Sequence, residues 1–429
     1  MTLVLVVLFG LMLLGIPVAF AILSAGMAYL ATTGGSMLVV AQRLIYGLNS
    51  FTLLAVPLFI LVGNLMDFGG ISKRLTDWAK SILGWLPGGL GIVTVFSCAI
   101  FAALTGSGPA TVAAIGSIML PSMLKAGYSR ETSAGLVASA GALGPIIPPS
   151  IPMIIYGVTM NLSIPAMFMA GVVPGLVIAL ALSLVNVVFA YRNPEVLKHA
   201  KTMKFDFKES MKLFRKALGA LGLPVLILGG IYGGIFTPTE SAAVGIVYAL
   251  ILGFALKELK VKDLPKILIN SLKTSTMVNF IIAAASLFSW VVSKSQIGIV
   301  ISNAFISFVG GSQALYLFVL VVVLLIVGCL MDNVAATLIL APILIPVGIA
   351  LGCNELHIGM LFCICLVVGF VTPPFGYNLF TAVSISGLNF KQIVKGALPF
   401  LLTEILLLFV FAYVPGIITW LPRLMGYGY

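Results

Sequence analysis

Long apolar runs recur along the whole chain and constrain its fold more than any other feature. Examples occupy residues 2–31, 174–191, 315–331 and 399–413, and a helix that crosses a bilayer needs about 20 mainly apolar residues. Charged residues make up only 8% of the sequence, whereas an ordinary soluble domain carries about 25%. A water-soluble protein this apolar could not cover its surface. The sequence therefore predicts an all-α polytopic membrane protein.

The net charge of +11 comes from basic residues in short loops between the apolar runs. In membrane proteins, short loops rich in Lys and Arg stay on the cytoplasmic side. We therefore interpret the basic residues as marking the loops on the cytoplasmic side of the membrane. The lipid bilayer is the expected partner, and we expect no nucleic-acid partner.

Glycines and prolines repeat at one spacing in the two halves of the chain. Pro121 and Pro346 are 225 residues apart (346 − 121), and the same offset joins Gly127 to Gly352. It also joins three further pairs, Gly144 and Gly369, Pro148 and Pro373, and Pro149 and Pro374. Five ungapped coincidences at one spacing predict an internal repeat.

Equivalent loops of the two halves differ in charge. The loop with Lys125 and Arg130 has its counterpart at 352–356, which carries no Lys or Arg. Further along, the bias reverses, because 161–165 is uncharged and 389–395 carries two lysines. Equivalent loops are therefore expected on opposite sides of the membrane. This inverted-topology repeat is typical of secondary transporters.

The predicted topology divides the chain into two repeats, 1–190 and 218–429, joined by a lysine-rich cytoplasmic connector at 191–217. Each repeat is expected to hold a re-entrant hairpin and a broken helix, at 88–124 and 130–160 in the first and at 313–347 and 357–387 in the second. The segments 72–85 and 262–273 are expected to lie in the membrane interface. Both termini are predicted to be periplasmic.

Four clusters containing Gly or Pro interrupt the apolar stretches, and they form two matched pairs. The first pair is 104–109 with 328–333, and the second is 141–149 with 369–374. Proline removes a backbone donor and glycine weakens a helix, and each freed peptide group costs several kcal/mol if it faces lipid. Such helix ends bind ions and anionic substrates. We expect two sodium sites flanking one substrate site.

Isolated acidic residues and histidines allow more than one interpretation. Asp332, at the predicted second tip, either caps the following half-helix, contributes to the site, or does both. Glu240 is expected to stabilise a helix start, and Glu404 to contact another membrane subunit or lie near the membrane interface. His199 and His357 are expected to be solvated.

The broken stretches also carry the resemblance to a known family. TGSGPATVAAIGSIMLP (105–121), GALGPIIPPSIPMIIYG (141–157), MDNVAATLILAPILIPV (331–347) and GFVTPPFGYNLF (369–380) are the residues concerned. Together they resemble the large membrane subunit, DctM-like, of the TRAP (tripartite ATP-independent periplasmic) transporters.

The resemblance implies an elevator-type fold, similar to the ion transporter superfamily, in the bacterial inner membrane. It implies sodium-coupled import of an organic acid such as a C4-dicarboxylate or sialic acid, with no cofactor beyond sodium ions. The expected partners are a small four-helix membrane subunit, on a separate chain, and a periplasmic substrate-binding protein. Carried over by position, the sodium ligands would be Thr105, Ser107, Gly141, Gly144, Pro145, Gly328, Asp332, Gly369 and Thr372. The substrate-binding candidates are Gly108, Pro109, Pro149, Asn333 and Pro374.

Other function classes fit the sequence less well. A stand-alone sodium/carboxylate symporter of similar fold, needing no binding protein, is the main alternative. The apolar spans hold no cluster of His, Asp and Glu, and the chain has only two histidines, so we do not expect an enzyme. A channel would have no need for matched re-entrant pairs.

Overall fold

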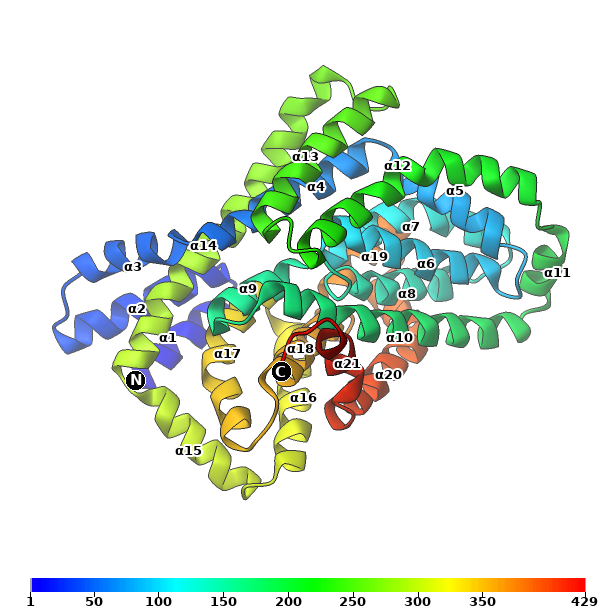
Figure 1. The fold of residues 1–429 in the computed structure, drawn as a ribbon. Helices are drawn as coiled ribbons and strands as arrows, with labels where there is room; N and C mark the ends of the chain where they lie inside the picture. Colours follow the sequence, from blue (N-terminus) through cyan, green and yellow to red (C-terminus); the bar gives the residue numbers. More distant parts are fainter. Residues whose placement is uncertain (1, 429) are drawn as a thin grey trace.

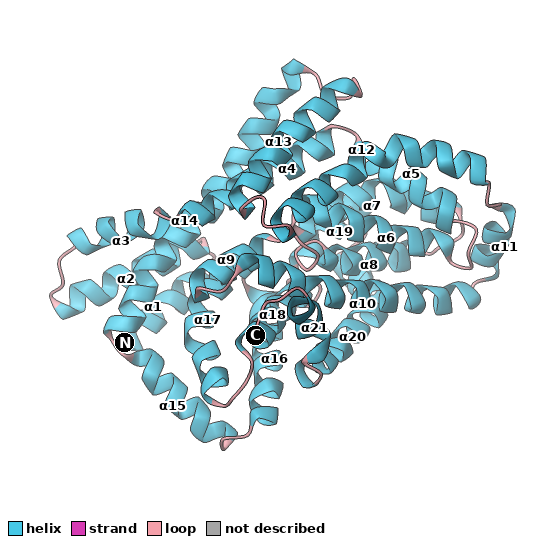
Figure 2. Ribbon diagram, viewed as in Figure 1, coloured by secondary structure: helices cyan, strands magenta, loops and turns pink. Residues whose placement is uncertain are grey.

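The computed structural model describes residues 2–428. Within these residues the chain consists of helices joined by short loops, with no strand (Figure 2). Eight of the described helices are long and apolar enough to cross a bilayer. The predicted all-α polytopic fold is therefore confirmed.

The first half of the chain forms the helices α1 to α10, of which α10 is the longest (Figure 1). In chain order they are α1 (Thr2–Leu13), α2 (Val18–Thr33), α3 (Leu38–Leu48), α4 (Ala55–Phe68), α5 (Ile71–Leu83), α6 (Gly89–Thr105), α7 (Gly108–Lys125), α8 (Arg130–Ala140), α9 (Ile151–Met160) and α10 (Ile164–Tyr191). The lysine-rich connector contains α11 (Pro194–Thr202).

The second half of the chain is also all-helical in the described residues. Its helices are α12 (Phe207–Tyr232), α13 (Pro238–Ala255), α14 (Leu264–Lys294), α15 (Ile297–Val309), α16 (Gln313–Leu330), α17 (Asn333–Ala350), α18 (Glu355–Gly369), α19 (Tyr377–Ser386), α20 (Phe390–Tyr413) and α21 (Gly416–Leu424). Three short 3₁₀ helices complete the described residues, η1 (Phe51–Leu54), η2 (Gly141–Leu143) and η3 (Val261–Asp263).

The helix hairpins keep the spacing found in the sequence. α7 begins at Gly108 and α17 at Asn333 (333 − 108 = 225), and they end at Lys125 and Ala350 (350 − 125 = 225). Each is the returning arm of a hairpin whose first arm is α6 or α16. These two helix pairs occupy nearly the ranges expected for the hairpins, 88–124 and 313–347.

The two tips turn by different means. At the first tip Gly106 has φ +60°, a left-handed conformation that glycine adopts without steric cost, and its N–H donates to the carbonyl of Ala102. At the second tip the Asp332 carboxylate caps α17, its Oδ1 accepting from the Val334 N–H at 2.8 Å. The capping role predicted for Asp332 is thus present.

Each broken helix packs its backbone on the hairpin of its own half. A Cβ added at Gly144 would lie 2.5 Å from the Ser107 carbonyl oxygen. One added at Gly369 would lie 2.4 Å from the carbonyl carbon of Gly328. Only a glycine, which has no Cβ, allows such close backbone contacts. These glycines therefore determine how closely the hairpin tip and the broken helix can pack.

The 31-residue helix α14 is longer than predicted. The helices α2, α3, α4 and α17 pack along it, and α15 follows its C-terminal end (Figure 1). Most of the segment 262–273, which was expected in the membrane interface, is the first part of this continuous helix. Pro265 stands in the first turn, where proline is tolerated, and no proline or glycine interrupts the helix afterwards.

The fold buries two polar residues, which contradicts the solvated position expected for His357 and the contact with another subunit expected for Glu404. His357 is 1% exposed rather than solvated, and its Nε2 lies 2.8 Å from the carbonyl oxygen of Phe411. Glu404 is also 1% exposed, so this chain itself covers it and another subunit does not. The His357 contact joins α18 to α20, which pack against each other. The expected helix-start role of Glu240 is confirmed by its capping box with Thr237.

Candidate functional site

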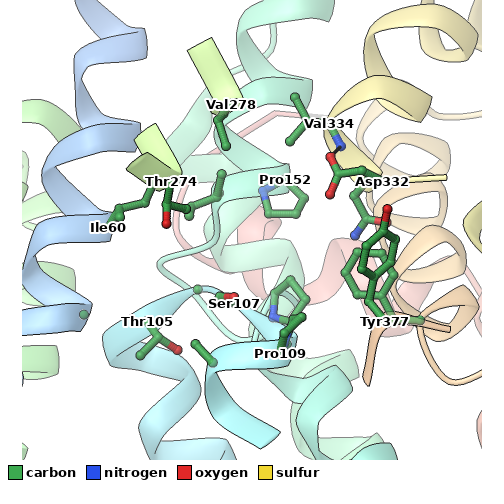
Figure 3. Close-up of a pocket in the computed structure, with 18 of the residues that line it drawn as sticks. Ile60, Thr105, Ser107, Pro109, Pro152, Thr274, Val278, Asp332, Val334 and Tyr377 are labelled. Carbon is green, nitrogen blue, oxygen red and sulfur yellow. Dashed lines mark hydrogen bonds between the residues drawn. The ribbon is translucent and has the colours of Figure 1, made fainter. Parts of the chain in front are cut away.

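A cavity of about 420 Å³ lies between the tips of the two hairpins (Figure 3). Ser107, Gly108 and Pro109 line it from the first tip, and Asp332 and Asn333 line it from the second. α4 and α14 supply the facing wall. Residues more than 200 positions apart in the sequence therefore line one cavity.

Residues of the two halves that are 225 positions apart line the cavity together. Five pairs at the 225-residue offset face it, Ser107 with Asp332, Gly108 with Asn333, Pro109 with Val334, Pro145 with Phe370, and Pro152 with Tyr377. The first half supplies small residues and prolines at these places, whereas the second half supplies larger or more polar side chains. The two halves thus frame one site but contribute different chemistry to it.

Oxygen atoms gather at the first tip. The Oγ1 atoms of Thr105 and Thr111 are 3.3 Å apart, and the Thr111 hydroxyl donates to the Ser107 carbonyl at 2.8 Å. Hydroxyl and carbonyl oxygens are ligands that suit a small hard cation. The sequence analysis missed Thr111, although its place one helical turn after Ser107 on the hairpin could have indicated it.

The second tip carries an unpartnered amide. Asn333 is 2% exposed, and neither its Oδ1 nor its Nδ2 has a hydrogen-bond partner among the described residues. One turn later on the same helix face, the buried Thr337 hydroxyl also lacks a partner there. Buried polar groups in folded proteins are nearly always hydrogen-bonded. Asn333, which lines the cavity, is therefore well suited to hold a bound solute or ion.

The charge of the cavity comes from Asp332 and Asp67, and the described lining includes no Lys or Arg. Positive partial charge comes instead from helix ends, because the first residues of α7, α9, α17 and α19 all line it. Each helix N-terminus is equivalent to about half a unit of positive charge. The cavity can therefore hold a cation beside its carboxylates and an anion beside its helix ends.

The predicted site residues fall into two groups. Those that line the cavity are Thr105, Ser107, Gly108, Pro109, Pro145, Asp332 and Asn333. Those outside its lining are Gly141, Gly144, Pro149, Gly328, Gly369, Thr372 and Pro374. Within the second group, Gly144 and Gly369 support the tips through backbone contact. The Thr372 hydroxyl donates to the Val368 carbonyl at 3.0 Å.

Several lining residues were not expected from the sequence. Asn64 and Thr274 come from α4 and α14, and Asn64 Nδ2 donates to the Ser271 hydroxyl at 2.8 Å. No local pattern marks these residues, since long-range packing brings them to the tips. Tyr377 could have been found, because the 225-residue offset pairs it with Pro152 (377 − 152).

Residues 5–417 match the family model described as the tripartite ATP-independent periplasmic transporter, DctM component. The chain belongs to the DctM family. Among its DctM relatives, the C4-dicarboxylate TRAP transporter large permease protein of Pseudomonas aeruginosa is 40% identical, over 94% of each chain. The 2,3-diketo-L-gulonate large permease of Escherichia coli is 37% identical, over 94% of this chain and 95% of the relative. The sialic acid large permease of Vibrio cholerae is 34% identical, over 98% of each.

Solved structures of other transporters share the DctM fold seen here. The YdaH transporter of Alcanivorax borkumensis superposes with a TM-score of 0.60 at 14% identity, covering 94% of this chain and 89% of that one. MtrF of Neisseria gonorrhoeae gives 0.59 at 15% identity, covering 91% and 85%. At this identity the likeness concerns the fold alone. The family resemblance read from the sequence motifs is confirmed by the family match.

Proposed function

We propose that this chain is the large membrane subunit of a sodium-coupled importer that moves an organic acid by an elevator mechanism. The cavity between the hairpin tips carries the proposal, because it combines carboxylates and hydroxyls with four helix N-termini. A small four-helix membrane subunit and a periplasmic substrate-binding protein would complete the transporter. The family to which the chain belongs supports this assembly.

Sodium is the coupling ion that best fits the oxygens at the tips. Asp332 supplies a carboxylate beside the cavity, and Thr105 and Thr111 bring two hydroxyls within 3.3 Å of each other. The break residues Gly141, Gly144, Gly328, Gly369 and Thr372 would complete the sodium sites with backbone and hydroxyl oxygens. A bound cation next to Asp332 would also offset the repulsion between that carboxylate and an acidic substrate.

The substrate class follows from the charge of the cavity and from the relatives. Helix N-termini attract carboxylates, and relatives carry C4-dicarboxylate, 2,3-diketo-L-gulonate and sialic acid in their names. We propose that the acid binds beside Gly108, Pro109 and Asn333. Pro149 and Pro374 lie outside the cavity lining and would act by keeping the breaks open.

The elevator proposal concerns how the two tips move. α4 and α14 would stay fixed while both hairpins and broken helices slide along them and carry the solute across the inner membrane. In this arrangement the connector 191–217 is cytoplasmic and both termini are periplasmic. The loop charges support the orientation, because Lys125 and Arg130 have no basic counterpart at 352–356.

Uptake into proteoliposomes tests this function. The chain is reconstituted with its small subunit, and its binding protein is added outside with labelled succinate, sialic acid or 2,3-diketo-L-gulonate. We expect one of these acids to accumulate under an inward sodium gradient, and accumulation to stop when choline replaces sodium. Uptake that continues without sodium would contradict the coupling.

The same experiment distinguishes the proposed binding-protein-dependent importer from a stand-alone symporter. Leaving out the binding protein is expected to reduce uptake to background. Full sodium-driven uptake without it would assign the chain to the symporter alternative. No uptake of any of the three acids by the complete assembly would refute the proposed substrate class.

A further inference from the structure

A second cavity lies beside the first, between α3, α9, α14 and α17, with a volume of about 610 Å³. Ser286, Ser289 and Ser293 line it from α14, at spacings of three and four residues that put them on one helix face. Asn49 and Thr159 add further polar groups. The cavity is thus much more polar than its position between apolar helices requires.

Arg43 is the single charged residue of this cavity, since the described lining contains no carboxylate and no other cation. Its guanidinium carbon lies 5.7 Å from the centre of the Tyr46 ring and 5.5 Å from that of Trp290. Aromatic faces hold an arginine in place without neutralising it. Arg43 is therefore a fixed positive charge that lacks an acidic partner inside the cavity.

Gly47 explains how this arginine comes to face the serines. A Cβ at Gly47 would lie 2.4 Å from the Cβ of Ser286, so glycine is what lets α3 lie directly on α14. Arg43 is one helical turn before Gly47 and shares its helix face. The close crossing of the two helices therefore builds the Arg43 cavity.

Each of three helices, α9, α14 and α17, lines the tip cavity with one part of its length and the Arg43 cavity with the next part. α9 contributes Pro152 to the tip cavity and Ile155 to the Arg43 cavity, and α17 contributes Val334 to the first and Leu338 to the second. On both helices the step is three or four residues, about 5 Å along the axis. Along α14, Val278 and Ile282 make the same step. The two cavities are thus neighbours on one interface.

We propose that the Arg43 cavity is a second binding site for the carboxylate of the transported acid, at the outer end of its route to the hairpin tips. This inference rests on the proposed function for the identity of the solute and for which end is outer. Arg43 attracts the carboxylate, and the serine hydroxyls donate hydrogen bonds to it. The described lining of the tip cavity includes no basic side chain, so Arg43 supplies the charge attraction that the tips lack.

Trp290 provides a direct readout of this site. Replacing Trp78, Trp85 and Trp420 with Phe leaves Trp290 as the sole tryptophan of the chain. The complete membrane complex, in neutral detergent without sodium, is titrated with succinate, sialic acid and 2,3-diketo-L-gulonate. A tryptophan-free small subunit is used. We expect a saturable change in Trp290 emission with the transported acid, and none with neutral succinamide.

Variants of Arg43 decide the assignment. Arg43→Gln should weaken the response by about tenfold or more, because one charge-assisted interaction is lost, and Arg43→Lys should restore part of it. In uptake assays Arg43→Gln should raise KM several-fold and leave the maximal rate unchanged. An unchanged Trp290 titration in Arg43→Gln, with normal gel-filtration behaviour, would overturn the site. So would competition by phosphatidylglycerol, which would reassign it to a lipid headgroup.

The failure of this inference can be told from failure of the proposed function. If an acid is taken up but causes no change in Trp290 emission, the proposed Arg43 site is refuted and the proposed importer function stands. A response that needs Arg43, in a complex that transports none of the three acids, would keep the site and refute the proposed substrate class.

Discussion

Asp332 and Ser107 occupy equivalent tip positions yet differ in charge. Ser107 has an extended backbone, and its side chain makes no capping hydrogen bond. Asp332 caps α17 and also lines the cavity. The second tip therefore carries the negative charge that the first tip lacks. Removal of this charge should affect transport more than any change at Ser107.

Asp332→Ala is expected to reduce sodium-dependent uptake to background, because the carboxylate beside the cavity is lost. Loss of the cap alone would cost only about 1 kcal/mol of stability. Asp332→Asn keeps a capping oxygen but not the charge, and it should also be inactive. Proteoliposome uptake at several sodium concentrations measures the effect.

Asp206→Ala is the matched control for these variants. Asp206 caps α12 through the N–H groups of Lys208 and Glu209, outside the cavity. It should cost a similar amount of stability and leave uptake unchanged. Normal sodium-dependent uptake by Asp332→Ala would remove Asp332 from the site.

Single residues were predictable where their effect is local. Asp332 was recognised as a cap because the following residues form an apolar half-helix, and capping depends on the nearest turn only. His357 and Glu404 were misjudged, since their burial depends on how α18 and α20 pack against distant helices of the chain. Asn64 and Thr274 line the cavity for the same long-range reason and leave no trace in sequence spacing.

At the scale of the helices, the crossing of α16 and α18 determines the shape of the second tip. Gly328 and Gly369 meet backbone to backbone, and a Cβ on either would approach atoms of the other helix to 3.2 Å or less. Backbone cannot swing aside as a flexible side chain can. A methyl group here must therefore separate the two helices.

Gly369→Ala is expected to destabilise the protein by about 1–3 kcal/mol, the usual cost of overpacking, and to impair uptake. Its melting temperature, followed by fluorescence-detected gel filtration, should fall by several degrees. Gly229→Ala in α12 is the control, because nothing lies within 4 Å of a Cβ there. Equal melting temperatures for the two variants would contradict the close crossing.

The positions of the helix breaks were predictable from the sequence, because Gly and Pro act on the helix in which they stand. Their positions gave both hairpins and both broken helices before any contact was known. The extent of α14 was not predictable in this way. Its first turns carry lysines that suggested an interfacial helix, whereas the backbone continues without a break to Lys294.

At the scale of the whole molecule, the two halves should face opposite sides of the membrane. Ser129 and Asn354 cap α8 and α18 and are 225 residues apart (354 − 129). They are therefore equivalent positions with the same local role. A difference in their accessibility would report orientation only.

Ser129→Cys should react from the cytoplasm and Asn354→Cys from the periplasm with a membrane-impermeant maleimide. All five native cysteines are buried and free, so their background should be low. Labelling of intact cells and of inside-out vesicles separates the two sides. Reaction of both variants from one side would disprove the inverted arrangement.

A cross-link between the tip and the wall tests the elevator movement. Pro109 and Thr274 line the tip cavity from α7 and α14 (Figure 3). Joining Pro109→Cys to Thr274→Cys with a cleavable bifunctional reagent should abolish uptake, and reduction should restore it. Undiminished uptake by fully cross-linked protein would mean that the hairpin does not slide along α14.

The unequal lining of the tip cavity has a consequence for how the solute specificity of such a protein could change. At the five positions paired by the 225-residue offset, the first half contributes glycine, serine and prolines, whereas Asn333, Val334, Phe370 and Tyr377 of the second half present larger side chains. Substitution of these second-half residues changes the lining and leaves the glycine and prolines of the first half in place. Among the paired positions, new solute preferences should therefore arise mainly in the second half.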